Sequence, residues 1–177
     1  MNEQRDLEGI SALVTGASSG IDRAAAEQLG RHGAEVVVHG RDPARGSAVV
    51  DTITAEGGKA RLVAADLSDP AQLDDPAQLD DLAEHAGTVD VLVNNAGFPW
   101  FGPTADLDVA TFNRLFAANV RAPYFLVAAL APKMAARGSG SIISFASMAG
   151  QIGIPGGAAY GATKGALASM TRSWAVT

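Results

Sequence analysis

The sequence predicts an α/β fold in which a doubly wound parallel sheet is covered by helices on both faces. Short β-branched runs alternate with longer helical stretches along the chain, a pattern typical of such sheets. The short runs are almost continuously apolar, as expected for strands buried on both faces. A turn of small residues, Gly16 to Gly20, joins the first run to the first helical stretch. Residues 1–177 are expected to form one domain.

Five strands and five helical stretches are expected. The strands are Ser11–Thr15, Glu35–His39, Arg61–Ala65, Val89–Val93 and Ser141–Phe145. The helical stretches lie near Ile21–Arg31, Ala44–Ala55, Pro76–His85 and Leu107–Ala136, and a last one begins near Ala158. Dinucleotide-binding sheets commonly have six strands in the order 3-2-1-4-5-6. The prediction is therefore a Rossmann-type sheet with five strands present and its C-terminal strands missing, so that the fifth strand forms an open edge.

Six residues are repeated in tandem before the fourth strand, as Asp69–Asp74 and Asp75–Asp80. Six residues advance an α-helix by about 600°, so one continuous helix would turn Leu73 and Leu79 to different faces. Pro76 suits a first helical position that Asp75 caps. We therefore expect the first copy to form a loop or turn and the second copy to begin the helix.

Composition and charge argue against several functions. The net charge of −6 gives little support for a nucleic-acid surface. The lack of cysteine excludes disulfides, thiolate metal sites and a cysteine nucleophile. His32, His39 and His85 lack the spacing of a metal-binding helix, so surface or packing roles are expected. The polar N-terminus is unlike a secretory signal, and the apolar stretch between Arg121 and Lys133 is too short to span a membrane. A cytoplasmic protein is expected.

The turn from Thr15 to Ile21 has the composition of a phosphate-binding loop. Small residues let backbone N–H groups approach a pyrophosphate, and the helix N-terminus adds positive potential. The same residues match the G-x-S-x-G nucleophile elbow of α/β hydrolases, with Ser18 as the nucleophile. A hydrolase would need a histidine near the end of the chain, and the last one is His85. Phosphate binding is therefore favoured.

Further motifs follow the fourth and fifth strands. Asn94-Asn95-Ala96-Gly97 follows the fourth strand, and Ser147 stands 13 positions before Tyr160-Gly161-Ala162-Thr163-Lys164. With the glycine-rich turn, these motifs resemble the YxxxK branch of the short-chain dehydrogenase/reductases, including members similar to 3-oxoacyl-carrier-protein reductases. The resemblance implies a catalytic tetrad of Asn119, Ser147, Tyr160 and Lys164. The expected cofactor site comprises Gly16, Ser18, Ser19, Gly20, Ile21, Arg41, Asp66, Leu67, Asn94, Ala96, Gly97, Tyr160 and Lys164.

The implied reaction is the NAD(P)-dependent interconversion of a carbonyl and an alcohol. Tyr160 and Lys164 are four positions apart and so share one helix face. A neighbouring ammonium favours the phenolate form of a tyrosine, which suits Tyr160 for acid/base work. The resemblance implies that Ser147 holds the substrate oxygen and that Asn119 helps to place a relay water near Lys164. Taken alone, a Tyr and a Lys at this spacing usually form only a surface pair.

The end of the second strand bears on the choice of cofactor. The run His39-Gly40-Arg41 has no acid where NAD binders usually carry one for the ribose hydroxyls. Arg41 can pair with a 2′-phosphate, so NADP is expected over NAD; the alternative is a solvated loop arginine. Asp66 and Leu67 resemble the adenine-contacting pair of the family.

Two features depart from the family pattern. Asp22 stands where the family usually has a third glycine, and it adds a negative charge beside two phosphates. We therefore expect Asp22→Gly to tighten NADPH binding. The chain also stops at Thr177, inside the helix of Tyr160, without the family's later strands and substrate lid. Two hypotheses follow: an NADP-dependent carbonyl reductase or alcohol dehydrogenase, and a catalytically silent, truncated nucleotide-binding or dimerising remnant.

The expected partner is a small-molecule carbonyl or alcohol substrate, and neither nucleic acid nor a membrane is expected. Phe98–Phe101 and Ile152–Gly157 suit an apolar pocket, although plain packing explains the aromatic residues equally well. Thioesters of 3-oxoacyl groups, ketosteroid-like rings and small ketones all stay open as substrates. The resemblance also implies a homodimer or homo-oligomer that pairs through the helices of Asn119 and Tyr160.

Overall fold

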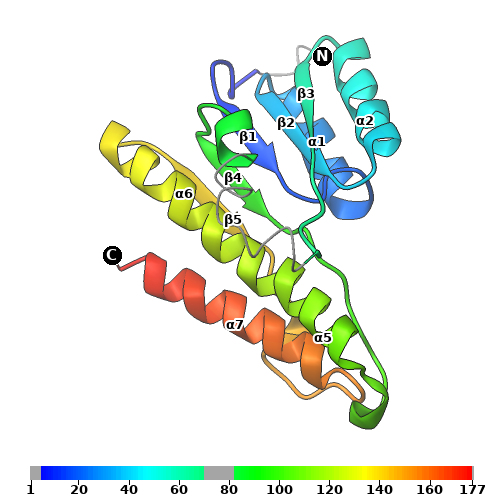
Figure 1. Cartoon of the computed structure of the whole chain (residues 1–177). Helices are drawn as coiled ribbons and strands as arrows, with labels where there is room; N and C mark the ends of the chain where they lie inside the picture. Colours follow the sequence, from blue (N-terminus) through cyan, green and yellow to red (C-terminus); the bar gives the residue numbers. More distant parts are fainter. Residues whose placement is uncertain (1–4, 70–81, 177) are drawn as a thin grey trace.

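The computed structural model describes residues 5–69 and 82–176, and it contains a five-stranded parallel sheet. The strands are β1 (Ser11–Val14), β2 (Glu35–Gly40), β3 (Lys59–Ala64), β4 (Val91–Asn94) and β5 (Ser141–Ser144). Their order across the sheet is β3-β2-β1-β4-β5 (Figure 1). The order and the parallel pairing confirm the predicted Rossmann-type fold. Because the strand order reverses between β1 and β4, a crevice is expected at the carboxyl ends of these two strands.

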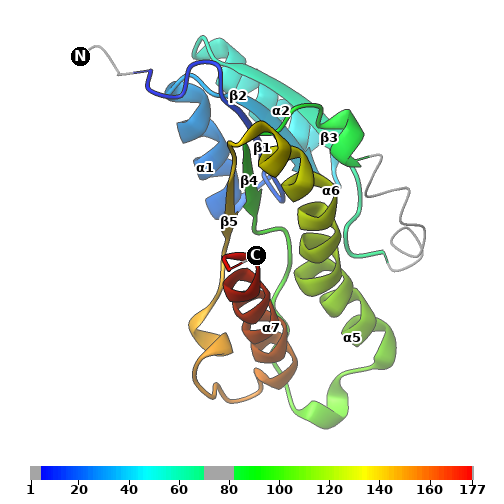
Figure 2. The ribbon, with the colours of Figure 1, turned by 90° about the vertical axis from the view of Figure 1, so that its left-hand side faces the viewer.

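Helices cover both faces of the sheet. The helices α1 (Gly20–Arg31) and α6 (Ala122–Arg137) lie on opposite sides of it (Figure 2). The helix α2 (Pro43–Ala55) packs beside α1 on β2 and β3. The helix α5 (Val109–Phe116) runs into α6 through a π-helical turn over Ala117–Arg121, and α7 (Ala158–Trp174) packs against that turn and α5.

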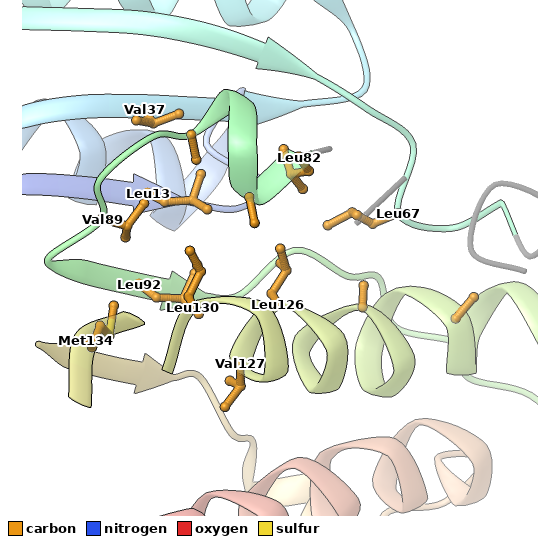
Figure 3. Close-up of a cluster of buried hydrophobic side chains, with 14 residues drawn as sticks. Leu13, Val37, Leu67, Leu82, Val89, Leu92, Leu126, Val127, Leu130 and Met134 are labelled. Atoms are coloured by element: carbon orange, nitrogen blue, oxygen red, sulfur yellow. The ribbon is translucent and has the colours of Figure 1, made fainter. Parts of the chain in front are cut away.

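The strands contribute side chains alternately to two apolar layers, as the pleat of a strand requires. Ala12, Val14, Val36 and Val38 pack in the layer beneath α1 and α2. Leu13, Val37 and Leu92 pack in the other layer with Leu126, Leu130 and Met134 of α6 (Figure 3). The central strands β2, β1 and β4 are therefore buried on both faces, which explains their nearly continuous apolar runs, whereas β3 and β5 at the edges of the sheet are partly exposed.

The helical run from Val109 to Arg137 spans 29 residues and is long and apolar enough to cross a membrane. In the fold, half of its most apolar window is buried, and Leu126 and Leu130 are almost completely inaccessible. Packing against the sheet therefore accounts for the apolar character of this run (Figure 3).

Several element boundaries differ from the prediction. The predicted helix Leu107–Ala136 begins at Val109 instead, because the Asp108 carboxylate accepts a hydrogen bond of 2.9 Å from the backbone N–H of Thr111 and caps it. The π-helical turn within that run was not predicted. The strand β4 begins at Val91, two residues later than expected. The predictions for the repeated hexapeptide lie outside the described residues beyond Asp69, and residues 82–85 are helical.

Candidate active site

A crevice opens at the carboxyl ends of β1 to β4. It is lined by Gly16, Ser18, Ser19, His39, Gly40, Arg41, Asp42, Arg45, Ala65, Asp66, Leu67, Ser68, Ala96, Gly97, Phe98 and Ala118. The structure thus gathers eight of the predicted cofactor residues: Gly16, Ser18, Ser19, Arg41, Asp66, Leu67, Ala96 and Gly97. Of the described residues, Gly20, Ile21, Asn94, Tyr160 and Lys164 do not line it; Ile21 is exposed and Asn94 is buried in β4.

The glycine-rich turn requires glycine for both conformation and space. Gly16 has a φ of +79°, and a Cβ atom there would stand 3.0 Å from the Cα atom of Ala96. A Cβ atom on Gly40 would stand 2.9 Å from the Ser18 hydroxyl oxygen. Ser19 precedes α1 without making a side-chain capping bond, so the first amides of α1 receive no cap from it. The turn is therefore a small-residue cradle at a helix N-terminus.

Thr15 joins the glycine-rich turn to the turn after β4. Its side-chain oxygen is buried and accepts hydrogen bonds of 3.1 Å from the backbone N–H groups of both Asn95 and Ala96. Its hydroxyl donates to the carbonyl of Val93 at 3.1 Å. Sequence reasoning missed this residue, although it stands directly before Gly16, where β1 passes into the turn.

Asn119 joins the same region to α7. Its side-chain oxygen accepts a hydrogen bond of 3.1 Å from the backbone N–H of Phe98, and its amide donates to the Phe98 carbonyl and to the Thr163 hydroxyl, each at 3.1 Å. Gly97 has no room for a side chain because the Asn119 amide lies against it. Asn119 lies in the π-helical turn, a feature common at functional sites. Pro123 has no N–H to donate to the Asn119 carbonyl four residues earlier.

The other three residues of the predicted tetrad lie near the end of β5 and in the first half of α7. Lys164 is 6% exposed, and its ammonium donates to the carbonyl of Phe145 at 2.8 Å. Burial lowers the pKa of Lys164, while the charge of Asp22 opposes this. The half-buried ring of Tyr160 meets that of Phe101 edge-on, with centroids 5.6 Å apart. Ser147 accepts a 3.2 Å hydrogen bond from the N–H of Ala149 and opens the short 3-10 turn Met148–Gly150.

Near the ends of β2 and β3, the crevice is lined by both acidic and basic side chains. Asp66 accepts hydrogen bonds from the Ser68 hydroxyl at 2.7 Å and the Ser68 N–H at 2.9 Å. Burial alone would raise the pKa of Asp66, but these bonds and the charges of Arg41 and Arg114 hold it below its ordinary value. Arg45 also lines the crevice, from the first turn of α2. Sequence reasoning missed Arg45, and the capping pattern of Asp42-Pro43 was the available signal for its position.

His39 is a buried wall of the crevice at the end of β2. Its Nδ1 atom accepts a hydrogen bond of 3.3 Å from the backbone N–H of Gly16, which requires an unprotonated nitrogen. Burial lowers the pKa of His39 to about 4, so the ring is neutral at neutral pH. A surface or packing role was expected for each of the three histidines; His39 is buried, whereas His32 and His85 are exposed.

Asp22 points into the protein. It is 8% exposed, its carboxylate accepts a hydrogen bond from the side-chain amide of Asn95, and its other oxygen lies against Gly16. Burial raises the pKa of Asp22, while the Asn95 hydrogen bond and the charge of Lys164 act in the opposite direction.

Comparison with known proteins agrees with these features. Residues 11–177 match the family model described as short chain dehydrogenase. The gluconate 5-dehydrogenase of Gluconobacter oxydans is 37% identical over 169 residues, which are 96% of this chain and 65% of that protein. An oxidoreductase of Thermotoga maritima is 33% identical over 97% of this chain and 66% of its own length. The chain thus spans just under two thirds of the length of these relatives.

Solved structures show the same fold. A metagenomic short-chain oxidoreductase in complex with NADP is 43% identical, with a TM-score of 0.85 over 94% of this chain and 74% of that one. The 3-oxoacyl (acyl-carrier-protein) reductase of Agrobacterium tumefaciens, with NADP bound, is 34% identical, with a TM-score of 0.87 over 96% of this chain and 65% of that one. By sequence and by structure, the chain belongs to the short-chain dehydrogenase/reductase family.

Proposed function

We propose that this protein interconverts a carbonyl and an alcohol by NADP-dependent hydride transfer, with Tyr160 as the acid/base. The observation that carries the proposal is the crevice at the reversal of strand order, where the glycine-rich turn and the turn after β4 meet. The side chain of Asn119 links that crevice to the helix of Tyr160 and Lys164. Relatives crystallised with NADP support the choice of cofactor.

The lining of the crevice fits a dinucleotide phosphate. Gly16 and Gly40 leave room that a Cβ atom would fill, and the N-terminus of α1 favours a negatively charged group. Arg41 and Arg45 supply the positive charges for a 2′-phosphate, and Asp66 with Leu67 suits the adenosine end. When bound, the nicotinamide ring supplies or accepts the hydride.

The residues of the chain itself transfer the proton and orient the substrate. The Tyr160 hydroxyl gives a proton to the carbonyl oxygen during reduction and takes it back during oxidation. Lys164 stands one helical turn after Tyr160 on α7, and the Ser147 hydroxyl orients the substrate oxygen. Asn119 acts by fixing the Phe98 backbone and the helix that carries Tyr160. Phe101, which packs on the Tyr160 ring, suits an apolar part of the substrate.

Two tyrosines give a matched test, because Tyr124 is half-exposed on α6. NADPH oxidation is measured with a 3-oxoacyl thioester, a keto sugar acid and a small ketone, and NADPH affinity by fluorescence titration. Tyr160→Phe is expected to lower kcat at least about 100-fold with little change in NADPH affinity, since general acid/base catalysis contributes about 10²–10⁴-fold. Tyr124→Phe is expected to keep full activity. Equal activity of both variants would contradict the role of Tyr160.

A second candidate function is nucleotide binding without turnover. The buried carboxylate of Asp22 favours it, because a negative charge between the two turns opposes a bound diphosphate. NADPH binding without oxidation on every substrate would support this second candidate against the first.

We also propose that two copies pair through α5, α6 and α7. Phe112 on α5 and Tyr124 on α6 are 41% and 48% exposed, and Val109 at the start of α5 is 75% exposed. Such apolar side chains on neighbouring helices are typical of subunit contacts. Light scattering should give twice the monomer mass, and a charged pair of substitutions, Phe112→Glu with Tyr124→Glu, should return the monomer.

A further inference from the structure

The two segments that border Tyr160 carry no charged side chain. Tyr160 stands in the first turn of α7, and its ring meets that of Phe101, from the loop after β4, with centroids 5.6 Å apart. Residues 91–105, which contain the loop after β4, and residues 138–163, which contain the loop before α7, have no Asp, Glu, Lys, Arg or His. Lys164 is 6% exposed, and its ammonium donates to a backbone carbonyl at 2.8 Å. A substrate at the Tyr160 hydroxyl is therefore bordered by neutral groups from both loops.

A backbone hydrogen bond joins these two loops close to Tyr160. The N–H of Gly102 donates to the carbonyl of Gly156 at 3.0 Å. Gly156 has a φ of +70°, and a Cβ atom there would stand 2.9 Å from the backbone nitrogen of Gly102. The approach of the loops therefore requires glycine at position 156, and it places Phe101, the neighbour of Gly102, beside α7.

The ring of Phe101 lies in space that Gly157 leaves open at the N-terminus of α7. A Cβ atom on Gly157 would stand 3.2 Å from Cε1 of Phe101 and 3.4 Å from Cβ of Ile154. Gly157 has a negative φ of −95°, so this glycine is required for space and not for a left-handed conformation. Phe101 is nevertheless 53% exposed. Phe101, Ile154 and the ring of Tyr160 therefore form an apolar surface that is partly open to solvent.

This apolar surface discriminates between charged and uncharged ligands. A carboxylate that leaves water for an apolar surface loses its hydration, and neither loop offers a cation in return. An aromatic ring loses little on leaving water, and ring pairs gain free energy beyond their buried area when they pack offset or edge-on. The surface therefore favours an uncharged ligand that carries an aromatic ring.

We propose that the substrate at this site is an uncharged ketone with an aromatic ring on its carbonyl carbon, or the secondary alcohol that its reduction gives. Phe101 packs on the ring of this substrate, and Ile154 disfavours a charged substituent on it. The inference rests on the proposed function, because it places the reacting oxygen at the Tyr160 hydroxyl. A keto sugar acid, which carries a carboxylate, is then a poor substrate.

The preference for an uncharged substrate is tested with two ketones of the same size. Para-acetylbenzamide is neutral, whereas para-acetylbenzoate is an anion at neutral pH. NADPH oxidation gives kcat/KM for each ketone, and saturation-transfer NMR in the presence of NADP+ gives each dissociation constant without turnover. The amide is expected to exceed the benzoate about tenfold or more in kcat/KM and in affinity.

A charge substitution then tests whether the apolar surface causes this preference. Ile154→Arg adds a cation beside Phe101 and is expected to raise the benzoate-to-amide ratio of kcat/KM about tenfold. Ile143→Arg makes the same change at an exposed position of β5 and should leave the ratio unchanged. Thermal unfolding confirms that both variants are folded.

The role of the Phe101 ring is tested with acetophenone and methyl hexyl ketone, two methyl ketones with equal numbers of carbon atoms. Phe101→Leu keeps an apolar side chain and removes the ring. It is expected to lower the acetophenone-to-methyl hexyl ketone ratio of kcat/KM by about threefold to tenfold. Phe112→Leu removes a ring of similar exposure on α5 and should keep the original ratio.

The outcomes separate this inference from the proposed function. Equal kcat/KM and equal affinity for the amide and the benzoate would overturn the inference and leave the carbonyl chemistry intact. A keto sugar acid as the preferred substrate, or a ratio of the two methyl ketones that Phe101→Leu leaves unchanged, would do the same. If no ketone supports NADPH oxidation, the proposed function fails, and the dissociation constants still decide which ligands the apolar surface prefers.

Discussion

The side-chain oxygen of Thr15 lies 3.1 Å from the backbone nitrogen of Asn95 and accepts its hydrogen bond. The same oxygen accepts from Ala96 and donates to Val93, so a single buried hydroxyl satisfies three backbone groups of a neighbouring strand and its turn. The side chain of Thr15, directly after β1, therefore helps to hold together the two turns that form the crevice. Thr15 belongs to the site as much as the glycines that follow it.

Thr15→Val keeps the shape of the side chain and removes this hydroxyl. Two backbone N–H groups then lose their acceptor in a buried region, and we expect the free energy of unfolding to fall by about 2 kcal/mol. Urea unfolding measures the change. Thr54→Val, on the exposed face of α2, removes a hydroxyl that bonds only within its own helix and is expected to change stability by less than about 0.5 kcal/mol. Similar losses in both variants would contradict the role of Thr15.

Asn119→Ala removes the connection between the loop after β4 and α7. The Phe98 backbone groups lose their partner and the Thr163 hydroxyl loses one of two, and we expect a loss of about 2–3 kcal/mol in unfolding free energy. Asn113→Ala, on the exposed side of α5, is the matched control and should have little effect. Chemical denaturation compares them, and a neutral Asn119→Ala would show that the connection does not stabilise the fold.

His39 should make stability depend on pH. Its pKa falls from 6.5 in the unfolded chain to about 4 in the fold, so the unfolded state binds more protons between these values. Its contribution is complete above about pH 6.5 and is lost as pH falls towards 4, by up to about 3 kcal/mol. Urea unfolding from pH 4 to 7.5 measures this slope.

His39→Asn keeps an acceptor for the Gly16 N–H and has no ring to protonate, so the slope should be reduced by that amount. His85→Asn, at an exposed position, should keep the original slope. An identical pH dependence in all three proteins would show that His39 is not the group responsible.

Arg41→Ala should remove the preference for NADPH over NADH. A charged pair with the 2′-phosphate is absent from NADH, so we expect NADPH affinity to fall about 10- to 100-fold and NADH affinity to stay nearly constant. Fluorescence titration with both nucleotides measures the ratio. Arg172→Ala, in the last turn of α7, removes the same charge far from the crevice and should affect neither nucleotide. An equal loss for both nucleotides would assign Arg41 a role other than phosphate recognition.

Periodicity and spacing were enough to predict the sheet, because its central strands are buried on both faces and their apolar runs are unambiguous. The glycine-rich turn and the turn after β4 were found for a similar reason, since close backbone approach allows few residue types at Gly16 and Gly97. Thr15 and Arg45 were missed because their roles depend on strands and loops that meet only in the fold. The inward orientation of the Asp22 side chain could be seen only in the structure, because a carboxylate in the first turn of a helix can equally well face solvent.

The π-helical turn at Ala117–Arg121 has a consequence for how this protein tolerates changes in chain length. One added residue in a helical turn rotates everything after it by about 100°. The turn therefore lets Asn119 meet Phe98 and Thr163 while Leu126 and Leu130 still meet the sheet. Deleting one residue between positions 117 and 121 would regularise the helix and turn one of these groups away from its partners. At this point of the chain the number of residues matters as well as the identity of Asn119.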